Sequence, residues 1–181
     1  KGIPVAGGLA GGSADAAAAL VAIDRLWGLE TSDDDLLSLA AQLGSDVPFA
    51  LIGGTALGSG HGEIVEPLED NGSYWWVVVP DPEGLSTPAV YAEFDAGGDP
   101  STVNAHADLV VALAAGSPRA LGDALANDLA PAAFRLRPEL AEHRALLEGT
   151  EAVATLLSGS GPSLLALAEN GDQARRVIEQ V

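Results

Sequence analysis

A cluster of glycines directly precedes an alanine-rich stretch near the start of the chain. The segment reads PVAGGLAGGSADAAAAL over residues 4–20. A glycine loop that leads into a helix presents unpaired N–H groups and the positive end of the helix dipole, and the missing side chains let an anion approach the backbone. The segment therefore predicts a phosphate-binding site, although a tight turn that only packs a helix on a sheet would use the same residue types.

The glycine loop matches neither of two common nucleotide-binding signatures. The Walker A pattern requires a lysine directly after its last glycine, and no lysine follows the glycines here. A Rossmann fingerprint requires an acidic residue at the end of a second strand about 20 residues later, and this sequence has none there. The loop alone is thus weak evidence for any particular nucleotide site.

Two further stretches carry groups suited to phosphate chemistry. LGSDVPFAL, residues 43–51, places Asp46 shortly before Pro48. A carboxylate there could accept or orient the proton of a substrate hydroxyl, or it could cap a short helix. SGSGPS, residues 158–163, predicts a second compact glycine turn, which could shape the site beside the first loop or simply join two strands.

In this order and spacing the segments resemble the GHMP kinase superfamily of small-molecule kinases. The matching stretches are PVAGGLAGGSADAA (4–17), LWGL (26–29), LGSDVP (43–48), GHGE (60–63) and SGSGPS (158–163). Within the superfamily, the set is most similar to members that phosphorylate a hydroxyl of a cytidine-diphosphate-linked methylerythritol in non-mevalonate isoprenoid biosynthesis. Two positions depart from the pattern, because Ala10 replaces a usual glycine and Ala14 replaces the second serine of a pair.

The resemblance implies an ATP-dependent kinase that uses Mg²⁺ and a small-molecule acceptor. It implies that Asp46 is catalytic and contacts the substrate, and that Thr87, Pro88 and Tyr91 border the acceptor, although these three also fit an ordinary helix start with a core tyrosine. It implies that Ser13 is a magnesium ligand. The residues that it assigns to ATP are Pro4, Val5, Ala6, Gly7, Gly8, Leu9, Ala10, Gly11, Gly12, Ser13 and Ala14.

The same resemblance implies a two-domain α+β GHMP kinase fold. Residues 1–70 would be the C-terminal portion of the ATP-binding domain, which is ribosomal protein S5 domain 2-like, and residues 71–181 a ferredoxin-like C-terminal domain. Lys1 does not match the lysine that such kinases carry near their N-terminus. We therefore expect the sequence to be the C-terminal part of a longer enzyme.

The elements that must position these groups follow from caps and apolar periodicity. Helix 13–27 would begin at Ser13, end at Gly28 and bury Leu20, Ile23 and Trp27. Helix 32–43 would be capped by Ser32, with Asp33, Asp34 and Asp35 in its first turn and Leu36, Leu39, Ala40 and Leu43 buried. The strands expected are 49–52, 55–57, 63–65, 74–80 (buried), 153–157 and 164–168, and the remaining helices are 87–94, 103–115, 118–126, 138–148 and 172–180. Asn127 and Asp128 would form a cap or turn pair.

Composition excludes several classes of function. The formal net charge is −18 and Lys1 is the only lysine, so a broad nucleic-acid surface is excluded. No apolar run reaches the ~18 residues of a membrane span, and the absence of cysteine fits a cytoplasmic protein. We expect a monomer or a homodimer, without a sequence feature that decides between them. The alternatives are another GHMP kinase, acting on homoserine, mevalonate or a sugar, and a non-catalytic nucleotide-binding or acidic interaction domain.

Overall fold

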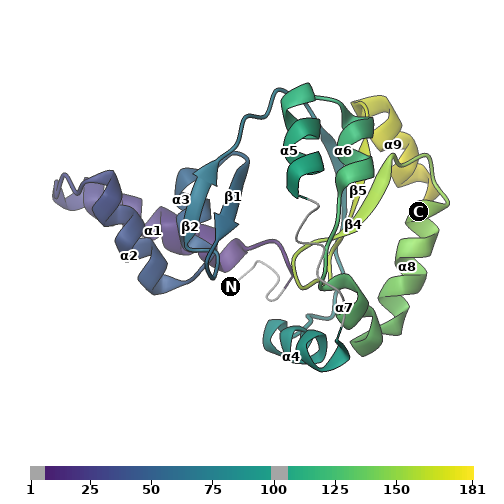
Figure 1. The fold of residues 1–181 in the computed structure, drawn as a ribbon, viewed down its shortest axis with the longest axis horizontal. Helices are drawn as coiled ribbons and strands as arrows, with labels where there is room; N and C mark the ends of the chain where they lie inside the picture. The colour runs from purple at the N-terminus through teal and green to yellow at the C-terminus, as the bar shows by residue number, and fades with distance from the viewer. Residues whose placement is uncertain (1–6, 99–105) are drawn as a thin grey trace. The chain divides into compact units, whose positions relative to one another are not determined.

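The computed structural model describes residues 7–98 and 106–181. Within these ranges the chain divides into two compact units, residues 10–69 and residues 70–181 together with residues 7–9. Both contain helices and antiparallel strands (Figure 1), so the predicted α+β class is confirmed. The predicted ATP contacts Pro4, Val5 and Ala6 lie outside the described residues, as does the start of the helix expected at 103–115.

The unit of residues 10–69 consists of three helices and a β-hairpin. Its small buried cluster is formed by Ala17, Ala40 and Val47, with Leu20 and Leu51 packed against it. The strands pair in antiparallel register. The elements are α1 (Gly11–Trp27), α2 (Asp33–Leu43), α3 (Val47–Ile52), β1 (Ala56–Ser59) and β2 (Ile64–Pro67).

Helix caps in this unit were predicted with mixed success. Ser32 accepts a hydrogen bond from the Asp35 N–H at the start of α2, and Gly28 ends α1 in the left-handed conformation, as expected. Ser13 as the cap of α1 is wrong, because the helix begins at Gly11 and its N-terminal cap is Ala10, with a φ of 48°. A left-handed residue turns the chain into the helix there, so no serine hydroxyl is needed as a cap.

The strand expected at 49–52 is also wrong, since Val47–Ile52 is a short helix. Pro48 lies in its first turn, where a backbone N–H would form no hydrogen bond within the helix, so its absence costs nothing. Gly53 ends the helix at a φ of 71°. The apolar run was too short to separate a strand from a buried helical turn.

Several apolar residues expected in the core lie at the surface. Trp27 is 68% exposed and Ile23 41%, and Leu39 and Leu43 are exposed as well. Leu20 and Ala40 lie in or against the buried cluster, as predicted. The periodicity identified an apolar face correctly, but a face is buried only where another element covers it.

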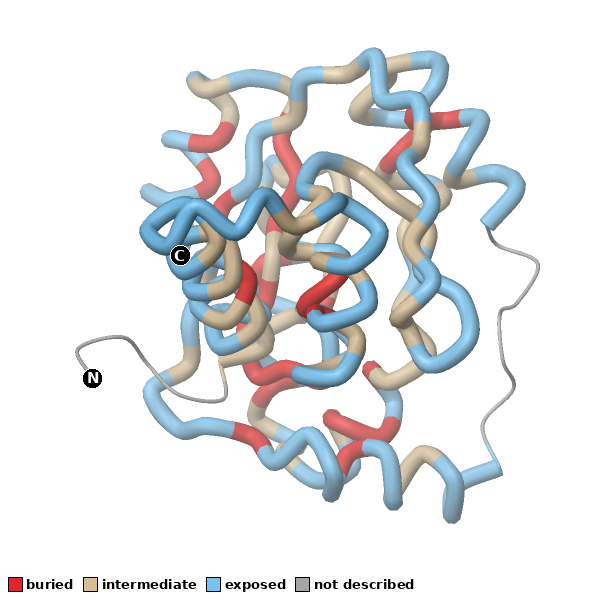
Figure 2. The backbone as a smooth tube through the Cα atoms, turned by 90° about the vertical axis from the view of Figure 1, so that its left-hand side faces the viewer, coloured by how far each residue is buried: buried red, intermediate tan, exposed pale blue. Residues whose placement is uncertain are grey.

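The larger unit is built on a three-stranded antiparallel sheet in the order β3-β5-β4. Helices α8 and α9 lie on one side of this sheet and α5 and α6 on the other (Figure 1). Buried residues, red in Figure 2, include Leu140, Leu157 and Ala166 at the centre of the core. The elements are β3 (Trp75–Val79), α4 (Thr87–Gly97), α5 (His106–Ala115), α6 (Pro118–Ala124), α7 (Ala130–Leu136), α8 (Pro138–Glu148), β4 (Ala154–Leu157), β5 (Leu164–Ala168) and α9 (Gly171–Gln180).

Two features of this unit differ from expectation. Helix α7 was not predicted, because its seven residues are rich in alanine and give no clear apolar stripe. Strand β3 is not buried but lies at the sheet edge, where Trp75 is 50% and Trp76 36% exposed. No helix among the described residues is long and apolar enough to cross a membrane.

Two leucines of α8 give a matched test of this core. Leu140 is fully buried in the sheet cluster, whereas Leu146 is 66% exposed. We expect Leu140→Ala to lower the free energy of unfolding by about 2–5 kcal/mol, since it removes apolar contacts and leaves a cavity. Leu146→Ala should change it by less than about 0.5 kcal/mol in the same urea denaturation experiment. Equal losses in the two variants would contradict the packing described here.

Candidate functional site

The glycine loop is held by two serines from the distant turn 158–163. The Ser158 hydroxyl donates to the Gly8 carbonyl at 2.7 Å, and the Ser163 hydroxyl donates to the Gly7 carbonyl at 2.6 Å. We call this pair of bonds the serine clamp. Ser163 is almost fully buried, so water competes little for its bond. The clamp joins segments that are 150 residues apart in the chain.

The serine clamp determines where the N–H groups of the loop point. In a planar trans peptide, the carbonyl of one residue and the N–H of the next lie on opposite sides. Because the carbonyls of Gly7 and Gly8 face the turn, the N–H groups of Gly8 and Leu9 face away from it. Neither N–H has a hydrogen-bond acceptor within the described parts of the chain, so both are available to an anion.

The start of α1 offers further donors. Ala14 N–H donates to the Ala10 carbonyl and closes the first turn, while the N–H groups of Gly11, Gly12 and Ser13 have no acceptor among the described residues. A Cβ added at Gly11 or Gly12 would meet nothing within 4 Å. The Ser13 hydroxyl, too, has no partner in the described ranges. The first turn of α1 is therefore an open set of donors at the positive end of a helix dipole.

Asp46 lies in the same unit as α1, at the N-terminal cap position of α3. Its side chain is exposed and forms no capping hydrogen bond. The capping alternative considered from the sequence therefore gains no support. The carboxylate is left free to interact with a hydroxyl group.

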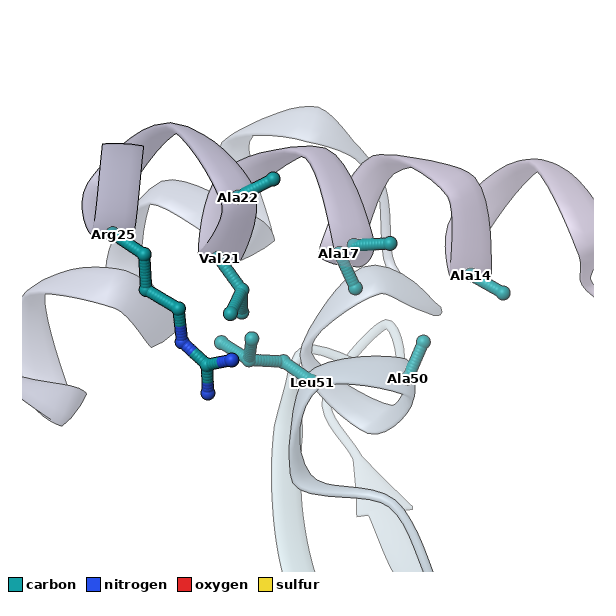
Figure 3. Close-up of a pocket in the computed structure, with 8 residues that line it drawn as sticks. Ala14, Ala17, Val21, Ala22, Arg25, Ala50 and Leu51 are labelled. Atoms are coloured by element: carbon teal, nitrogen blue, oxygen red, sulfur yellow. The ribbon is translucent and has the colours of Figure 1, made fainter. Parts of the chain in front are cut away.

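Residues of α1 and α3 line an apolar groove (Figure 3). It has a volume of about 400 Å³ and is lined by alanines such as Ala14 and Ala50, together with Val21 and Leu51. Ala50 lies one helical turn after Asp46, so the groove and the carboxylate share helix α3. Arg25, at the end of the groove, is the only lysine or arginine between residues 10 and 69. The apolar lining makes the groove itself unsuitable for phosphate.

The turn between β1 and β2 packs beside Asp46. A Cβ on Gly62 would lie 3.4 Å from the Ser45 Cβ, so the turn contacts the residue that precedes Asp46. Inside the turn, the Glu63 carboxylate accepts from the His61 N–H at 2.6 Å. Hydrogen bonds from the backbone N–H groups of Glu63 itself and of His61 lower the pKa of this carboxyl group. The GHGE motif thus forms a closed turn against the LGSDVP motif.

The residues expected to border the acceptor lie at the start of α4. The hydroxyls of Thr87 and Ser160 are 2.8 Å apart, so the structure brings Thr87 to the glycine turn 158–163. Pro88 is exposed, and Tyr91 is 52% exposed. The prediction of Tyr91 as an ordinary core residue is wrong, because about half of the residue is exposed.

Sequence reasoning missed the residues that hold the loop before α4. One Arg137 guanidinium nitrogen, Nη2, lies 3.3 Å from the Asp81 carboxylate, and the other, Nη1, donates to the Glu83 carbonyl at 3.2 Å. A hydrogen bond to the Glu139 side chain is the main reason that the pKa of Arg137 lies above its usual value. Since 56 residues separate Arg137 from Asp81, no local pattern could have shown this pair.

Two family models match the chain. The model described as GHMP kinases N terminal domain matches residues 1–54, and the model described as GHMP kinases C terminal matches residues 109–181. A protein of a Nocardioides species named 4-diphosphocytidyl-2-C-methyl-D-erythritol kinase is 61% identical over 97% of this chain and 60% of its own length. A protein of the same name from Nocardia farcinica is 50% identical over 100% and 60% of the two chains. The chain therefore spans about 60% of the length of these relatives.

Solved structures give a similar result. A crystal structure of 4-(cytidine 5'-diphospho)-2C-methyl-D-erythritol kinase matches with a TM-score of 0.77 and 38% identity, covering 99% of this chain and 63% of the other. A homoserine kinase from Cytophaga hutchinsonii matches with a TM-score of 0.76, covering 99% and 62% of the two chains, but is only 19% identical. The second match shows the fold alone.

Gly8 provides a test of the serine clamp. Its φ is 74°, and an added Cβ would lie 2.5 Å from the Ser158 carbonyl oxygen and 2.6 Å from that of Gly161. Gly98 has a φ of 61° with open space around it, so Gly98→Ala isolates the cost of the backbone conformation. We expect Gly8→Ala to lower the free energy of unfolding by about 1–3 kcal/mol more than Gly98→Ala, because backbone atoms must move. Equal losses in urea denaturation would show that the close approach is absent.

Proposed function

The chain belongs to the GHMP kinase family, and we propose that it is part of an ATP-dependent kinase that phosphorylates a hydroxyl of 4-diphosphocytidyl-2-C-methyl-D-erythritol. One observation supports it above the others: the N–H groups of Gly11, Gly12 and Ser13, at the start of α1, have no acceptor in the described chain. The named relatives at 50–61% identity favour this acceptor. We propose that the protein acts in the cytoplasm as a monomer or a homodimer.

ATP would be held through its phosphates by the loop of residues 4–14. The described part of this loop fits an anion, because a Cβ at Gly11 or Gly12 would meet no described residue within 4 Å and the α1 dipole is positive there. Cationic side chains contribute little, since Arg25 is the only lysine or arginine in residues 10–69. Binding would therefore rest on main-chain donors, which position the γ-phosphoryl group for transfer.

Mg²⁺ would be held by Ser13 on the protein side. Its hydroxyl has no partner within the described ranges and follows the open glycines directly. No cluster of three or more His, Asp or Glu side chains suited to a metal occurs among the described residues, so most of the remaining ligands would come from the nucleotide and water. When bound, the ion would offset phosphate charge that this acidic chain cannot neutralise.

Asp46 would act on the acceptor hydroxyl. Its exposed carboxylate, without a capping bond, can accept or orient the hydroxyl proton as the oxygen attacks the γ-phosphate. Thr87, Pro88 and Tyr91 would border the acceptor. Thr87 contributes through its contact with Ser160, and Tyr91 through its exposed ring.

A substrate panel tests the proposed reaction. The full-length gene product is incubated with ATP, Mg²⁺ and one acceptor at a time, and ADP release is measured. We expect turnover with the cytidylyl compound and none with homoserine, mevalonate or a sugar. Turnover with homoserine alone would identify a different kinase of the family, and nucleotide binding without turnover would indicate a non-catalytic domain.

Replacing Asp46 separates catalysis from folding. In the full-length enzyme, Asp46→Asn should lower kcat by about 10²–10⁴-fold, since the amide cannot accept the hydroxyl proton. The affinity for ATP should stay within about twofold and the free energy of unfolding within about 0.5 kcal/mol, because no capping bond is lost. Asp34→Asn, which removes the same charge from the first turn of α2, is the control. A kcat loss shared by both variants would argue against a catalytic role for Asp46.

A further inference from the structure

The side chain of Asn127 forms three hydrogen bonds, two of them to the segment around the glycine turn. Its amide nitrogen donates to the carbonyls of Leu157 and Gly159, both at 2.7 Å. Its amide oxygen accepts from the Leu129 N–H at 2.9 Å. The last bond is the local turn that the sequence predicted. The first two reach a segment 30 or more residues away and have no counterpart in the sequence pattern.

The two carbonyls that Asn127 holds lie on either side of Ser158 in the chain. Asn127 thus holds the peptide group before Ser158 and the one after Gly159, and this restricts the backbone that carries the Ser158 hydroxyl toward the Gly8 carbonyl. The rest of the turn closes on itself, because Ser158 N–H donates to the Ser163 carbonyl and Gly161 N–H donates to the Ser158 carbonyl. Asn127, which lies between α6 and α7, thus adds two hydrogen bonds to a turn that already bonds to itself.

We propose that Asn127 is a positioning residue for the phosphate loop. By holding the turn 158–163, it keeps the serine clamp formed, and the clamp in turn aims the N–H groups of Gly8 and Leu9 at the nucleotide phosphates. Asn127 itself would touch neither substrate. This inference rests on the proposed function in one respect only, namely that the loop binds a nucleotide.

The chemistry of the amide separates this role from a simple turn. Aspartate has the same shape and forms the same local turn through its side-chain oxygen. It cannot donate, however, and would place a negative oxygen against two carbonyl oxygens. A turn-forming residue therefore tolerates Asn127→Asp, whereas a positioning residue does not.

The test measures binding of a non-hydrolysable ATP analogue with Mg²⁺ to the full-length protein by calorimetry. Asn127→Ala and Asn127→Asp should each weaken binding by about tenfold, and Asn127→Asp at least as much as Asn127→Ala. Asn170→Ala is the matched control, since Asn170 caps α9 by accepting from the Gln173 N–H and has no contact with the glycine turn. It should lower thermal stability but leave the affinity within about twofold.

A double-mutant cycle shows whether Asn127 acts through the clamp. In a Ser158→Ala background, Asn127→Ala should weaken binding by less than about twofold further, because the bond that it supports is already gone. Asn170→Ala should behave in the same way in both backgrounds.

The outcomes separate this inference from the proposed function. Unchanged affinity in Asn127→Asp, or full additivity with Ser158→Ala, would overturn the positioning role and leave the kinase proposal intact. A wild-type protein that binds the nucleotide but does not use the cytidylyl acceptor would overturn the proposed acceptor only. Failure of the wild type to bind nucleotide would overturn both.

Discussion

Two hydrogen bonds from serine hydroxyls to glycine carbonyls are the interaction on which the candidate site depends. A glycine-rich loop has more backbone freedom than any other segment, so it binds an anion well only if something else restricts it. Here the restriction comes from Ser158 and Ser163, which hold the Gly8 and Gly7 carbonyls. Because a peptide group is rigid, fixing its carbonyl also fixes the following N–H. The clamp thus acts on the acceptor side of the backbone and prepares the donor side for a ligand.

The charge of the chain bears on how the proposed site would bind a nucleotide. A net charge of −18 repels a nucleotide over long distances, although salt screens much of that repulsion. Arg25 is the only lysine or arginine in residues 10–69, so in the proposed site the attraction from these residues would come mainly from short-range N–H donors, with a bound cation. Such donors lose affinity quickly if they point in the wrong direction. The acidity of the chain and the rigidity of its loop are therefore linked.

The sequence predicted turns and helix ends better than it predicted packing. Motifs are local, so the glycine loop, the 158–163 turn, the Ser32 cap and the Gly28 helix end could all be identified from neighbouring residues. Burial is not local: the stripe containing Trp27 is apolar, but what covers a face depends on the rest of the fold.

Short elements failed for a related reason. Residues 49–52 are too few to distinguish the helical repeat of 3.6 residues from the strand repeat of two, and Pro48 lies in the first turn of α3, where a helix tolerates proline. The bonds from Asn127 to the glycine turn span 30 residues or more, and no spacing rule could reveal them.

The glycines of the loop are present for two different physical reasons. Gly8 is required by the protein itself, since a Cβ would collide with carbonyl oxygens of the turn and its φ is 74°. An added Cβ at Gly11 or Gly12 would meet none of the described residues within 4 Å, so packing in the described chain does not require these glycines, whereas the proposed approach of a phosphate would. Ala10 sharpens this distinction, because it adopts a left-handed φ of 48° that costs an alanine about 1–2 kcal/mol. A strained conformation of this kind persists only where the surrounding chain imposes it. The shape of the loop is thus maintained even where the residue best suited to it has been replaced.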